Sequence, residues 1–332
     1  MKILGIETSC DETAAAVWIG DRLGSNIIAS QDVHKLYGGV VPELASRAHV
    51  RLIWPLVARA LEEAQVSKTE LDGIATTYGP GLAGALLVGL NFAKGLALAL
   101  RLPFIGINHI EGHIFSNSVL DQGPVPPFLS LIISGGHTQL VLVKAWGTYE
   151  ILGKTRDDAA GEAFDKVAKM LELSYPGGPA IDRLARDGDP AYVTFPKGRF
   201  KDTPLDFSYS GLKTAVLYHL KSLTSEEKGR RKADIAASFQ EAAVQVLVDR
   251  SLLALESCGL NQLALAGGVA CNSLLRQKLQ NASQANDFQL FIPPPVLCTD
   301  NAAMIARTGK FYLEAGVTSD FGLSPRPSLR LG

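Results

Sequence analysis

Apolar and polar residues follow the same order in the two halves of the chain. Apolar runs at residues 3–6 and 14–19 flank a polar turn at 7–13. In the second half, the apolar run 128–133 leads into the turn 134–138 and then into further apolar residues. Short apolar runs joined by small and hydroxyl residues are typical of strand–turn–strand units. Each half is therefore predicted to begin with two adjacent strands.

A strand, a glycine turn and a helix also follow one another twice. Residues 73–77 predict a buried strand, and the glycines around Pro80 precede an apolar helix over 83–100. A strand at 263–266 and the glycines at 267–268 introduce the second helix. Units of this kind direct backbone N–H groups and a helix N-terminus toward an anion. The repetition favours a duplicated α/β fold with two lobes around a central cleft.

The chain has 332 residues, which exceeds what one hydrophobic core usually supports, so two domains are expected. The proline-rich sequence at 123–127 suits a linker. We predict an N-terminal lobe over 1–125, which carries the histidine pair described below, and a C-terminal lobe over 126–332. Residues 156–256 interrupt the repeat in the second lobe as a helical insertion. This insertion either contacts substrate or serves only in packing.

Composition narrows the class of protein. Hydrophobic residues make up 47% and charged residues 20%, as in soluble enzymes. The formal net charge of −1 excludes a protein that coats nucleic acid through its overall charge. The four cysteines lack CxxC spacing, which argues against a zinc ribbon or a disulfide framework. Because Asn91 and Lys94 interrupt the apolar stretch 82–100, and no signal peptide is recognised, we expect a cytoplasmic protein without a membrane span.

The segment His109-Ile110-Glu111-Gly112-His113 carries the sharpest local chemistry. On a helix, two histidines four positions apart share one face and can bind one metal ion. In zinc peptidases of the HExxH type, the glutamate directly follows the first histidine. Here Glu111 lies roughly 200° around the helix from His109. A peptidase is therefore disfavoured.

A catalytic metal site normally needs a third protein ligand and an open position. Asp300 is the best candidate, because it follows a proline-rich turn and directly precedes a helix predicted from about residue 302. An aspartate at such a junction also serves as an N-cap. From its own context, Asp300 is therefore either the third ligand or a helix cap.

Segments spread along nearly the whole chain resemble, in order, the family of tRNA threonylcarbamoyladenosine transferases, whose bacterial subunit is TsaD. They are GIETSCDET at 5–13, GVVPELASR at 39–47, HIEGH at 109–113, SGGHT at 134–138, DAAGEAFDK at 158–166, YPGGP at 175–179, FSYSGLK at 207–213, AGGV at 266–269 and CTDN at 298–301. The resemblance implies an actin-like or hexokinase-like (ASKHA) fold. It also implies transfer of threonylcarbamoyl from threonylcarbamoyl-AMP to N6 of adenosine 37, in tRNAs that read codons beginning with A. The product is N6-threonylcarbamoyladenosine (t6A).

The resemblance also implies the site residues. His109, His113 and Asp300 are expected to bind one divalent ion, Fe²⁺ or Zn²⁺, and a nucleotide (ATP, ADP or the adenylate substrate) is expected in the cleft. Non-catalytic relatives lack the metal residues, so this chain is expected to be the catalytic member. The expected substrate-binding residues are Ile132, Ile133, Ser134, Gly135, Gly136, Asp165, Gly178, Asp182 and Asn272.

Some of these roles have simpler alternatives. Asp165 suits a ribose contact but also a charge on a helix surface, and Asn272 suits either a nucleotide contact or a helix cap. Asp11 and Glu12, in the first turn, are candidate catalytic residues, and no general base is identified. A kinase or ATPase of the same fold, a metalloendopeptidase and a non-catalytic scaffold remain competing functions.

The expected partners are tRNA, a paralogous TsaB-type subunit that forms a heterodimer, and a small TsaE-type P-loop ATPase. The helical segment at 41–64 is a candidate dimer surface. Two basic clusters either contact tRNA or are solvated faces. They comprise Lys228, Arg230, Arg231 and Lys232, and Lys197, Arg199 and Lys201.

Overall fold

The structure is a computed structural model that describes residues 1–120, 122–198 and 200–331, except for the side chain of Lys35. Contacts divide the chain into two units, Met1–Gly123 with Thr299–Gly332, and Pro124–Cys298. The sequence predicts a second lobe that continues to residue 332. In the structure, the segment Thr299–Gly332 instead belongs to the first unit.

A mixed five-stranded sheet forms the centre of the first unit, in the order β3-β2-β1-β4-β5. The first three strands form an antiparallel meander, and β4 and β5 run parallel to β1. The predicted strand pair and the strand before the glycine turn are confirmed, whereas β3 has no counterpart in the prediction. The strands are β1 (Lys2–Glu7), β2 (Glu12–Ile19), β3 (Arg22–Ser30), β4 (Gly73–Gly79) and β5 (Phe104–Asn108).

The second unit repeats this sheet. Its order is β10-β9-β6-β7-β8. Read from the opposite edge, this is the order of the first sheet with five added to each strand number. The directions also match, since β6 pairs antiparallel with β7 and parallel with β9. The expected duplicated α/β fold is confirmed. The strands are β6 (Phe128–Ile133), β7 (Thr138–Ala145), β8 (Thr148–Lys154), β9 (Gln262–Ala266) and β10 (Gln289–Phe291).

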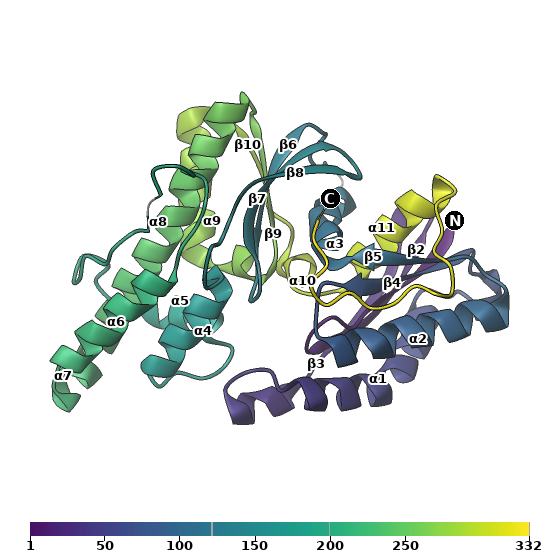
Figure 1. Cartoon of the computed structure of the whole chain (residues 1–332), viewed down its shortest axis with the longest axis horizontal. Helices are drawn as coiled ribbons and strands as arrows, with labels where there is room; N and C mark the ends of the chain where they lie inside the picture. Colours follow the sequence, from purple (N-terminus) through teal and green to yellow (C-terminus); the bar gives the residue numbers. More distant parts are fainter. Residues whose placement is uncertain (121, 199, 332) are drawn as a thin grey trace. The chain divides into compact units, whose positions relative to one another are not determined.

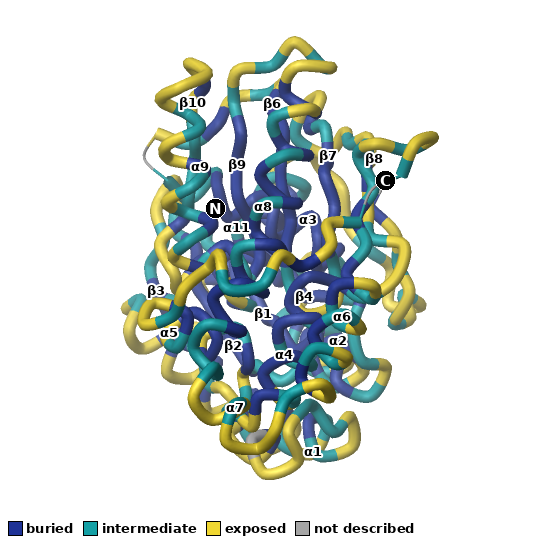
Figure 2. Tube along the Cα trace, turned by 90° about the vertical axis from the view of Figure 1, so that its left-hand side faces the viewer, coloured by how far each residue is buried: buried dark blue, intermediate teal, exposed yellow. Residues whose placement is uncertain are grey.

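Helices cover both faces of the first sheet (Figure 1). The helices α1 (Pro42–Glu63) and α2 (Ala83–Leu100) lie side by side on one face, and α11 (Ala302–Glu314) packs on the other beside the short α3 (His109–Phe115). Figure 2 shows the strands buried between these layers. Short 3₁₀ helices complete the unit at Asp32–Tyr37, Lys68–Glu70 and Ser116–Val119.

Glycines allow α11 to lie directly on the sheet. A Cβ atom at Gly5 of β1 would lie 2.5 Å from the Ala302 carbonyl oxygen and 2.7 Å from the Ala306 Cβ. A Cβ at Gly309 of α11 would lie 2.2 Å from the Ala75 Cβ on β4. This close approach explains why the last part of the chain belongs to the first unit.

The second unit carries the helical insertion. The helices α4 and α8 lie at its two ends, and further helices lie between them. The long α8 forms much of the core of this unit together with the sheet strands β6 and β9. The helices are α4 (Ala160–Met170), α5 (Gly177–Leu184), α6 (Ser210–Ser222), α7 (Ser225–Arg230), α8 (Lys232–Cys258), α9 (Ser273–Asn286) and α10 (Pro295–Cys298), with 3₁₀ turns at Ala185–Asp187 and Gly268–Cys271.

Candidate metal centre

The helix α3 begins where strand β5 ends. Asn108 is its N-cap, and the Asn108 side-chain oxygen accepts hydrogen bonds from the N–H groups of Ile110 (2.9 Å) and Glu111 (3.4 Å). This cap fixes the first turn of a helix that is too short to be stable alone. His109 and His113 therefore project from one face of α3 at the carboxyl end of the sheet.

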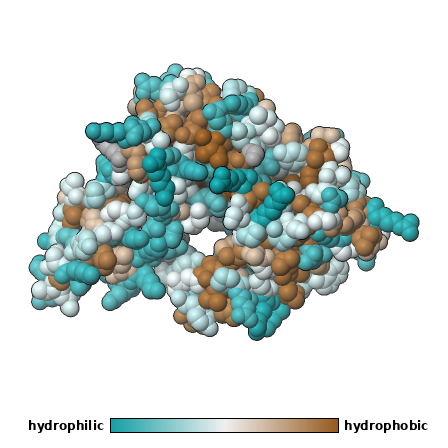
Figure 3. Space-filling model, in the orientation of Figure 1, coloured by the Kyte–Doolittle hydropathy of each residue, from teal (hydrophilic) through white to brown (hydrophobic). Residues whose placement is uncertain are grey.

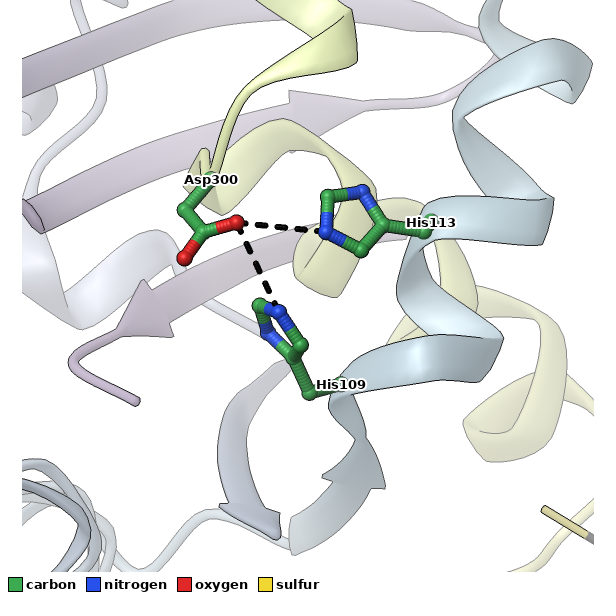
Figure 4. A group of neighbouring side chains, drawn as sticks. All are labelled: His109, His113 and Asp300. Atoms are coloured by element: carbon green, nitrogen blue, oxygen red, sulfur yellow. Dashed lines mark hydrogen bonds and ion pairs between the residues drawn. The ribbon is translucent and has the colours of Figure 1, made fainter. Parts of the chain in front are cut away.

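Asp300 lies in the loop between α10 and α11. The N-cap of α11 is Asn301, whose side chain accepts a hydrogen bond from the Met304 N–H at 3.0 Å. The helix-cap role that the sequence left open for Asp300 thus belongs to its neighbour. The carboxylate of Asp300 points toward the two imidazoles (Figure 4).

The three side chains converge with spacings that suit a metal ion. One oxygen of Asp300 lies 3.2 Å from Nε2 of His113 and 3.5 Å from Nε2 of His109. The three potential ligand atoms all lie within 4.8 Å of one another. Tetrahedral ligands about 2.1 Å from an ion lie about 3.4 Å apart. Nitrogen and carboxylate donors at this spacing fit Zn²⁺ or Fe²⁺.

Glu7, at the end of β1, contacts Nδ1 of His109, the ring nitrogen that does not face Asp300. Its carboxylate oxygens accept hydrogen bonds from Thr77 Oγ1 and the Ser9 N–H, both at 2.5 Å, and one oxygen lies 3.1 Å from Nδ1 of His109. A carboxylate that accepts from Nδ1–H leaves Nε2 free to bind a metal. No sequence pattern marks Glu7, because residues from β1, β4 and α3 meet there only in the folded chain.

The buried charges of the centre are coupled. Burial lowers the pKa of His109, but the carboxylates of Asp300 and Glu7 outweigh this effect and raise it to about 9 in the metal-free chain. Burial likewise raises the pKa of Glu7, yet the facing imidazolium outweighs it, so the pKa of Glu7 is lowered. Without a metal, His109 therefore holds a proton that a bound cation would replace.

Glu111 takes no part in the cluster. Its carboxylate accepts a hydrogen bond from the hydroxyl of Tyr312 on α11 at 2.6 Å. The side chain thus points toward α11 rather than toward the imidazoles of His109 and His113, as the helical spacing predicts. Glu111 is therefore not placed to activate a metal-bound water, as the glutamate of HExxH peptidases is.

Asp11 lies in the turn after β1, and Glu12 is the first residue of β2, where the carboxylates of Asp300 and Asp11 act on it. Burial raises the pKa of Glu12, and the carboxylates of Asp300 and Asp11 raise it further, to about 9. At neutral pH Glu12 therefore carries a proton in the metal-free chain and can donate a hydrogen bond. A bound cation would favour its ionised form.

The expected substrate residues lie in the second unit, where the first group surrounds the turn after β6. Ile132 and Ile133 are buried at the end of the strand. In the turn that follows, the Ser134 N–H donates to the His137 carbonyl at 2.8 Å. Added Cβ atoms at Gly135 and Gly136 would meet no atom within 4 Å. Packing does not require glycine there, so the open backbone is available to a ligand.

The other residues expected to bind substrate make internal contacts. Asp165 on α4 accepts a hydrogen bond from the Gly177 N–H at 2.7 Å, next to Gly178. Asp182 on α5 accepts from the Ser273 N–H at 3.2 Å and from its hydroxyl at 2.8 Å. These bonds bring the start of α5 to α4 and the start of α9 to α5. Asp165 is thus more than a surface charge.

Asn272 caps α9. Its side-chain oxygen accepts a hydrogen bond from the Leu275 N–H at 3.0 Å, and its amide donates to Gln240 Oε1 at 2.9 Å. The structure therefore shows the helix-cap role that the sequence analysis gave as an alternative. A nucleotide contact by Asn272 would have to share these groups.

Both basic clusters lie on the surface of the second unit. Lys228 and Arg230 are exposed on α7, whereas Arg231 pairs with Asp234 at 3.0 Å and stacks over Tyr192. In the second cluster, Lys197 and Lys201 are exposed, and Arg199 lies outside the described residues.

Comparison with known proteins identifies close relatives. Residues 22–307 match the family model described as TsaD, tRNA N6-adenosine threonylcarbamoyltransferase. A tRNA N6-adenosine threonylcarbamoyltransferase of Clostridium kluyveri is 51% identical over 335 residues, which cover 100% of this chain and 98% of the relative. The enzymes of the same name from Clostridium beijerinckii and Symbiobacterium thermophilum are each 52% identical over 332 residues, covering 99% of this chain and 98% and 97% of the relatives.

Solved structures share the fold at low sequence identity. Full-length HypF in the phosphate- and nucleotide-bound form superposes with a TM-score of 0.62 at 14% identity, and HypF of T. kodakarensis with 0.64 at 16%. These matches cover 96% and 95% of this chain, but only 47% and 48% of HypF. The chain therefore spans about half of HypF, and the likeness shows the actin-like fold alone.

Proposed function

The chain belongs to the TsaD family of tRNA N6-adenosine threonylcarbamoyltransferases, and we propose that it works with one divalent ion bound by His109, His113 and Asp300. As a member of this family, it forms N6-threonylcarbamoyladenosine on tRNA by threonylcarbamoyl transfer. The observation that carries the metal proposal is the convergence of two Nε2 atoms on one Asp300 oxygen at 3.2 and 3.5 Å.

The donor in this proposal is threonylcarbamoyl-AMP and the acceptor is N6 of adenosine 37, so that a C–N bond to N6 forms, AMP leaves and N6 loses one proton. When bound, the ion, Zn²⁺ or Fe²⁺, supplies Lewis acidity toward the carbonyl under attack. Glu7 keeps His109 in the tautomer that offers Nε2. Because an adenine amine is a weak nucleophile, orientation contributes more than a strong base. Asp11 and Glu12 are the candidate catalytic residues, and Glu12, whose pKa is raised, can hold or donate a proton near this centre.

For the adenylate we propose the turn Ser134-Gly135-Gly136 and the starts of α4, α5 and α9. The open backbone at Gly135 and Gly136 supports this role, and so does the free space around Gly178. The full proposed set is Ile132, Ile133, Ser134, Gly135, Gly136, Asp165, Gly178, Asp182 and Asn272.

We propose that a paralogous TsaB-type subunit binds the outer face of α1 and α2. Trp54 is 50% exposed on α1, and Leu87 and Leu98 are 46% and 67% exposed on α2. Trp54 also borders a groove of about 350 Å³ along Phe92 and Leu96. Figure 3 shows apolar residues over these helices. The helix α2 is long and apolar enough to cross a membrane, judged by length and composition alone. A helix that packs between a sheet and a partner protein can have the same apolar composition.

Removal of Trp54 tests this face. In Trp54→Ala we expect the affinity for the purified paralogous subunit to fall about tenfold or more, because a buried tryptophan anchors an interface. Tyr218→Ala is the control, since Tyr218 is 65% exposed on α6 of the other unit. Analytical ultracentrifugation measures both affinities. Equal affinity of wild type and Trp54→Ala would exclude this face.

For the other partners, we propose a TsaE-type P-loop ATPase and tRNA. The exposed Lys228 and Arg230 on α7 and Lys197 and Lys201 are the candidate tRNA contacts. If one of these two pairs contacts tRNA phosphates, neutralising that pair should reduce the salt dependence of tRNA binding. An unchanged salt dependence would exclude that pair as a tRNA contact. Action on tRNA supports a cytoplasmic location, which cell fractionation tests.

The proposed function is tested by direct transfer. Wild type and His113→Ala are incubated with partner proteins, threonylcarbamoyl-AMP and unmodified tRNA, and the nucleosides are analysed by mass spectrometry. We expect t6A with wild type and at least a hundredfold less with His113→Ala. Undiminished t6A from His113→Ala would remove the metal from the reaction. Transfer that is lost in this variant also excludes a mere scaffold, and t6A as product excludes a kinase or peptidase as the main activity.

A further inference from the structure

The C-terminal segment at residues 319–331, here called the C-terminal strap, crosses β5 and the end of β4. The Ser319 N–H donates to the Phe104 carbonyl of β5 at 2.9 Å, and the Arg326 N–H donates to the Tyr78 carbonyl of β4 at 2.7 Å. In Figure 1 this yellow segment has no regular secondary structure and ends beside α3. Backbone hydrogen bonds thus tie the strap to the two strands that precede α2 and α3.

The strap fits against a glycine. A Cβ atom at Gly79 would lie 2.1 Å from the Arg326 carbonyl oxygen and 3.0 Å from the Leu329 Cβ. The Gly81 N–H, just beyond, donates to the Pro327 carbonyl at 3.1 Å. Only a residue without a side chain leaves room for the strap at position 79.

The strap ends at the cap of the metal helix. The side-chain amide of Asn108 donates to the Arg330 carbonyl at 2.9 Å, while its oxygen caps α3 through Ile110 and Glu111. The Asn108 side chain is buried, and its two ends are thus held by two different parts of the chain. A cap that is fixed in this way orients the first turn of α3, which begins with the ligand His109.

We propose that Asn108 is a positioning residue for the metal centre, and that the C-terminal strap holds it in place through the Arg330 carbonyl. This inference rests on the proposed metal site and adds a structural requirement to it. The strap restricts the rotamers of Asn108, the Asn108 oxygen fixes the start of α3, and the imidazoles of α3 are thereby held at the spacing that a metal ion needs.

Two substitutions break the link at different points. Asn108→Asp keeps an oxygen to cap the helix, but it loses the N–H donor and faces the Arg330 carbonyl with a carboxylate. Gly79→Ala displaces the strap near Arg326 without changing Asn108. Gly229→Ala is the control, since a Cβ at this exposed glycine would meet no atom within 4 Å. A chain that ends at Pro325 serves as a second strap variant in case Gly79→Ala folds poorly.

The affinity for Zn²⁺ is measured by competition with a chromophoric chelator. We expect Asn108→Asp, Gly79→Ala and the shortened chain each to lose about five- to tenfold in affinity, and Gly229→Ala to match wild type. The double variant Asn108→Asp/Gly79→Ala should lose no more than either single variant, because both break one link. Affinities like that of wild type, or losses that add, would overturn the proposal.

Amide hydrogen exchange in the metal-free chain separates this inference from the metal site itself. We expect the amides of Ile110 and Glu111 to exchange about five- to tenfold faster in the strap variants than in wild type or Gly229→Ala. If wild type bound no metal, the proposed site would fail, while faster exchange would still show that the strap orders α3. Unchanged exchange at both amides would overturn the strap's role whatever the metal affinity.

Discussion

His109 is held between two carboxylates, and this arrangement decides which of its nitrogens can bind a metal. Glu7 faces Nδ1 at 3.1 Å, and Asp300 faces Nε2 at 3.5 Å. The other ligand differs, since Nδ1 of His113 is buried without a hydrogen-bond partner among the described residues. Of the two histidines, His109 is therefore the one whose Nδ1 is held by a neighbouring carboxylate.

Glu7→Gln tests this dependence. Three donors (Thr77, Ser9 and His109) converge on the carboxylate, and an amide nitrogen can accept from none of them. We expect Zn²⁺ affinity to fall about 10- to 100-fold, as measured by chelator competition. Glu111→Gln is the matched control, because this buried glutamate can still accept from Tyr312 after the change. Equal affinities of the two variants would remove Glu7 from the centre.

Metal binding should depend on pH through His109. In the metal-free chain its pKa is about 9, because Asp300 and Glu7 outweigh the effect of burial. Below that pH the imidazole is protonated, and the ion must displace the proton. Apparent Zn²⁺ affinity should therefore rise about tenfold per pH unit from pH 7 to 9 and level off above it. The release of a proton on Zn²⁺ binding, measured by calorimetry in buffers of different ionisation enthalpy, checks the direction of this pH dependence. An affinity that is constant from pH 7 to 9 would contradict it.

The residues of the proposed metal site could be predicted from the sequence to different degrees. The spacing of His109 and His113 indicates a shared helix face, which needs only helical geometry. Asp300 depended on the family resemblance, because its neighbourhood fitted a helix cap equally well; in the structure Asn301 is that cap. Glu7 carried no signal, since its partners lie far away in the sequence.

The helix α11 brings Asp300 to the histidines, and its position on the sheet depends on small residues. Gly5 lies beneath its first turn, where a Cβ would lie 2.6 Å from the Ala306 nitrogen. Runs of apolar residues predicted most of the strands and the long helix α2. The edge strands β3, β8 and β10 were missed, because they are partly exposed or short and their apolar pattern is weak.

Gly5→Ala should therefore disturb both stability and metal binding. Backbone lies against the added methyl group, so α11 must shift, and we expect about 1–3 kcal/mol of lost stability in urea denaturation. Zn²⁺ affinity should fall in parallel, because Asp300 precedes α11 directly. Gly211→Ala, at a glycine of α6 with open space around it, should change neither quantity. Unaltered metal affinity in a destabilised Gly5→Ala variant would show that the position of Asp300 does not depend on how α11 packs on the sheet.

For the whole molecule, the repeated sheet order identifies a duplication that the sequence pattern had predicted. The assignment of the last residues could not be predicted in the same way. They follow the second repeat in sequence, yet α11 and the C-terminal strap pack on the first sheet. Such a return of the chain depends on close contacts at Gly5 and Gly79, which periodicity does not reveal.

The central claim is that this chain transfers threonylcarbamoyl to tRNA with a single ion at His109, His113 and Asp300. It is tested most directly by stripping the wild-type chain with a chelator, restoring Zn²⁺ or Fe²⁺ in steps, and measuring t6A by mass spectrometry at each metal content. We predict that the yield of t6A rises in proportion to bound metal and stops rising at about one ion per chain. Full t6A formation by the stripped chain would contradict the account.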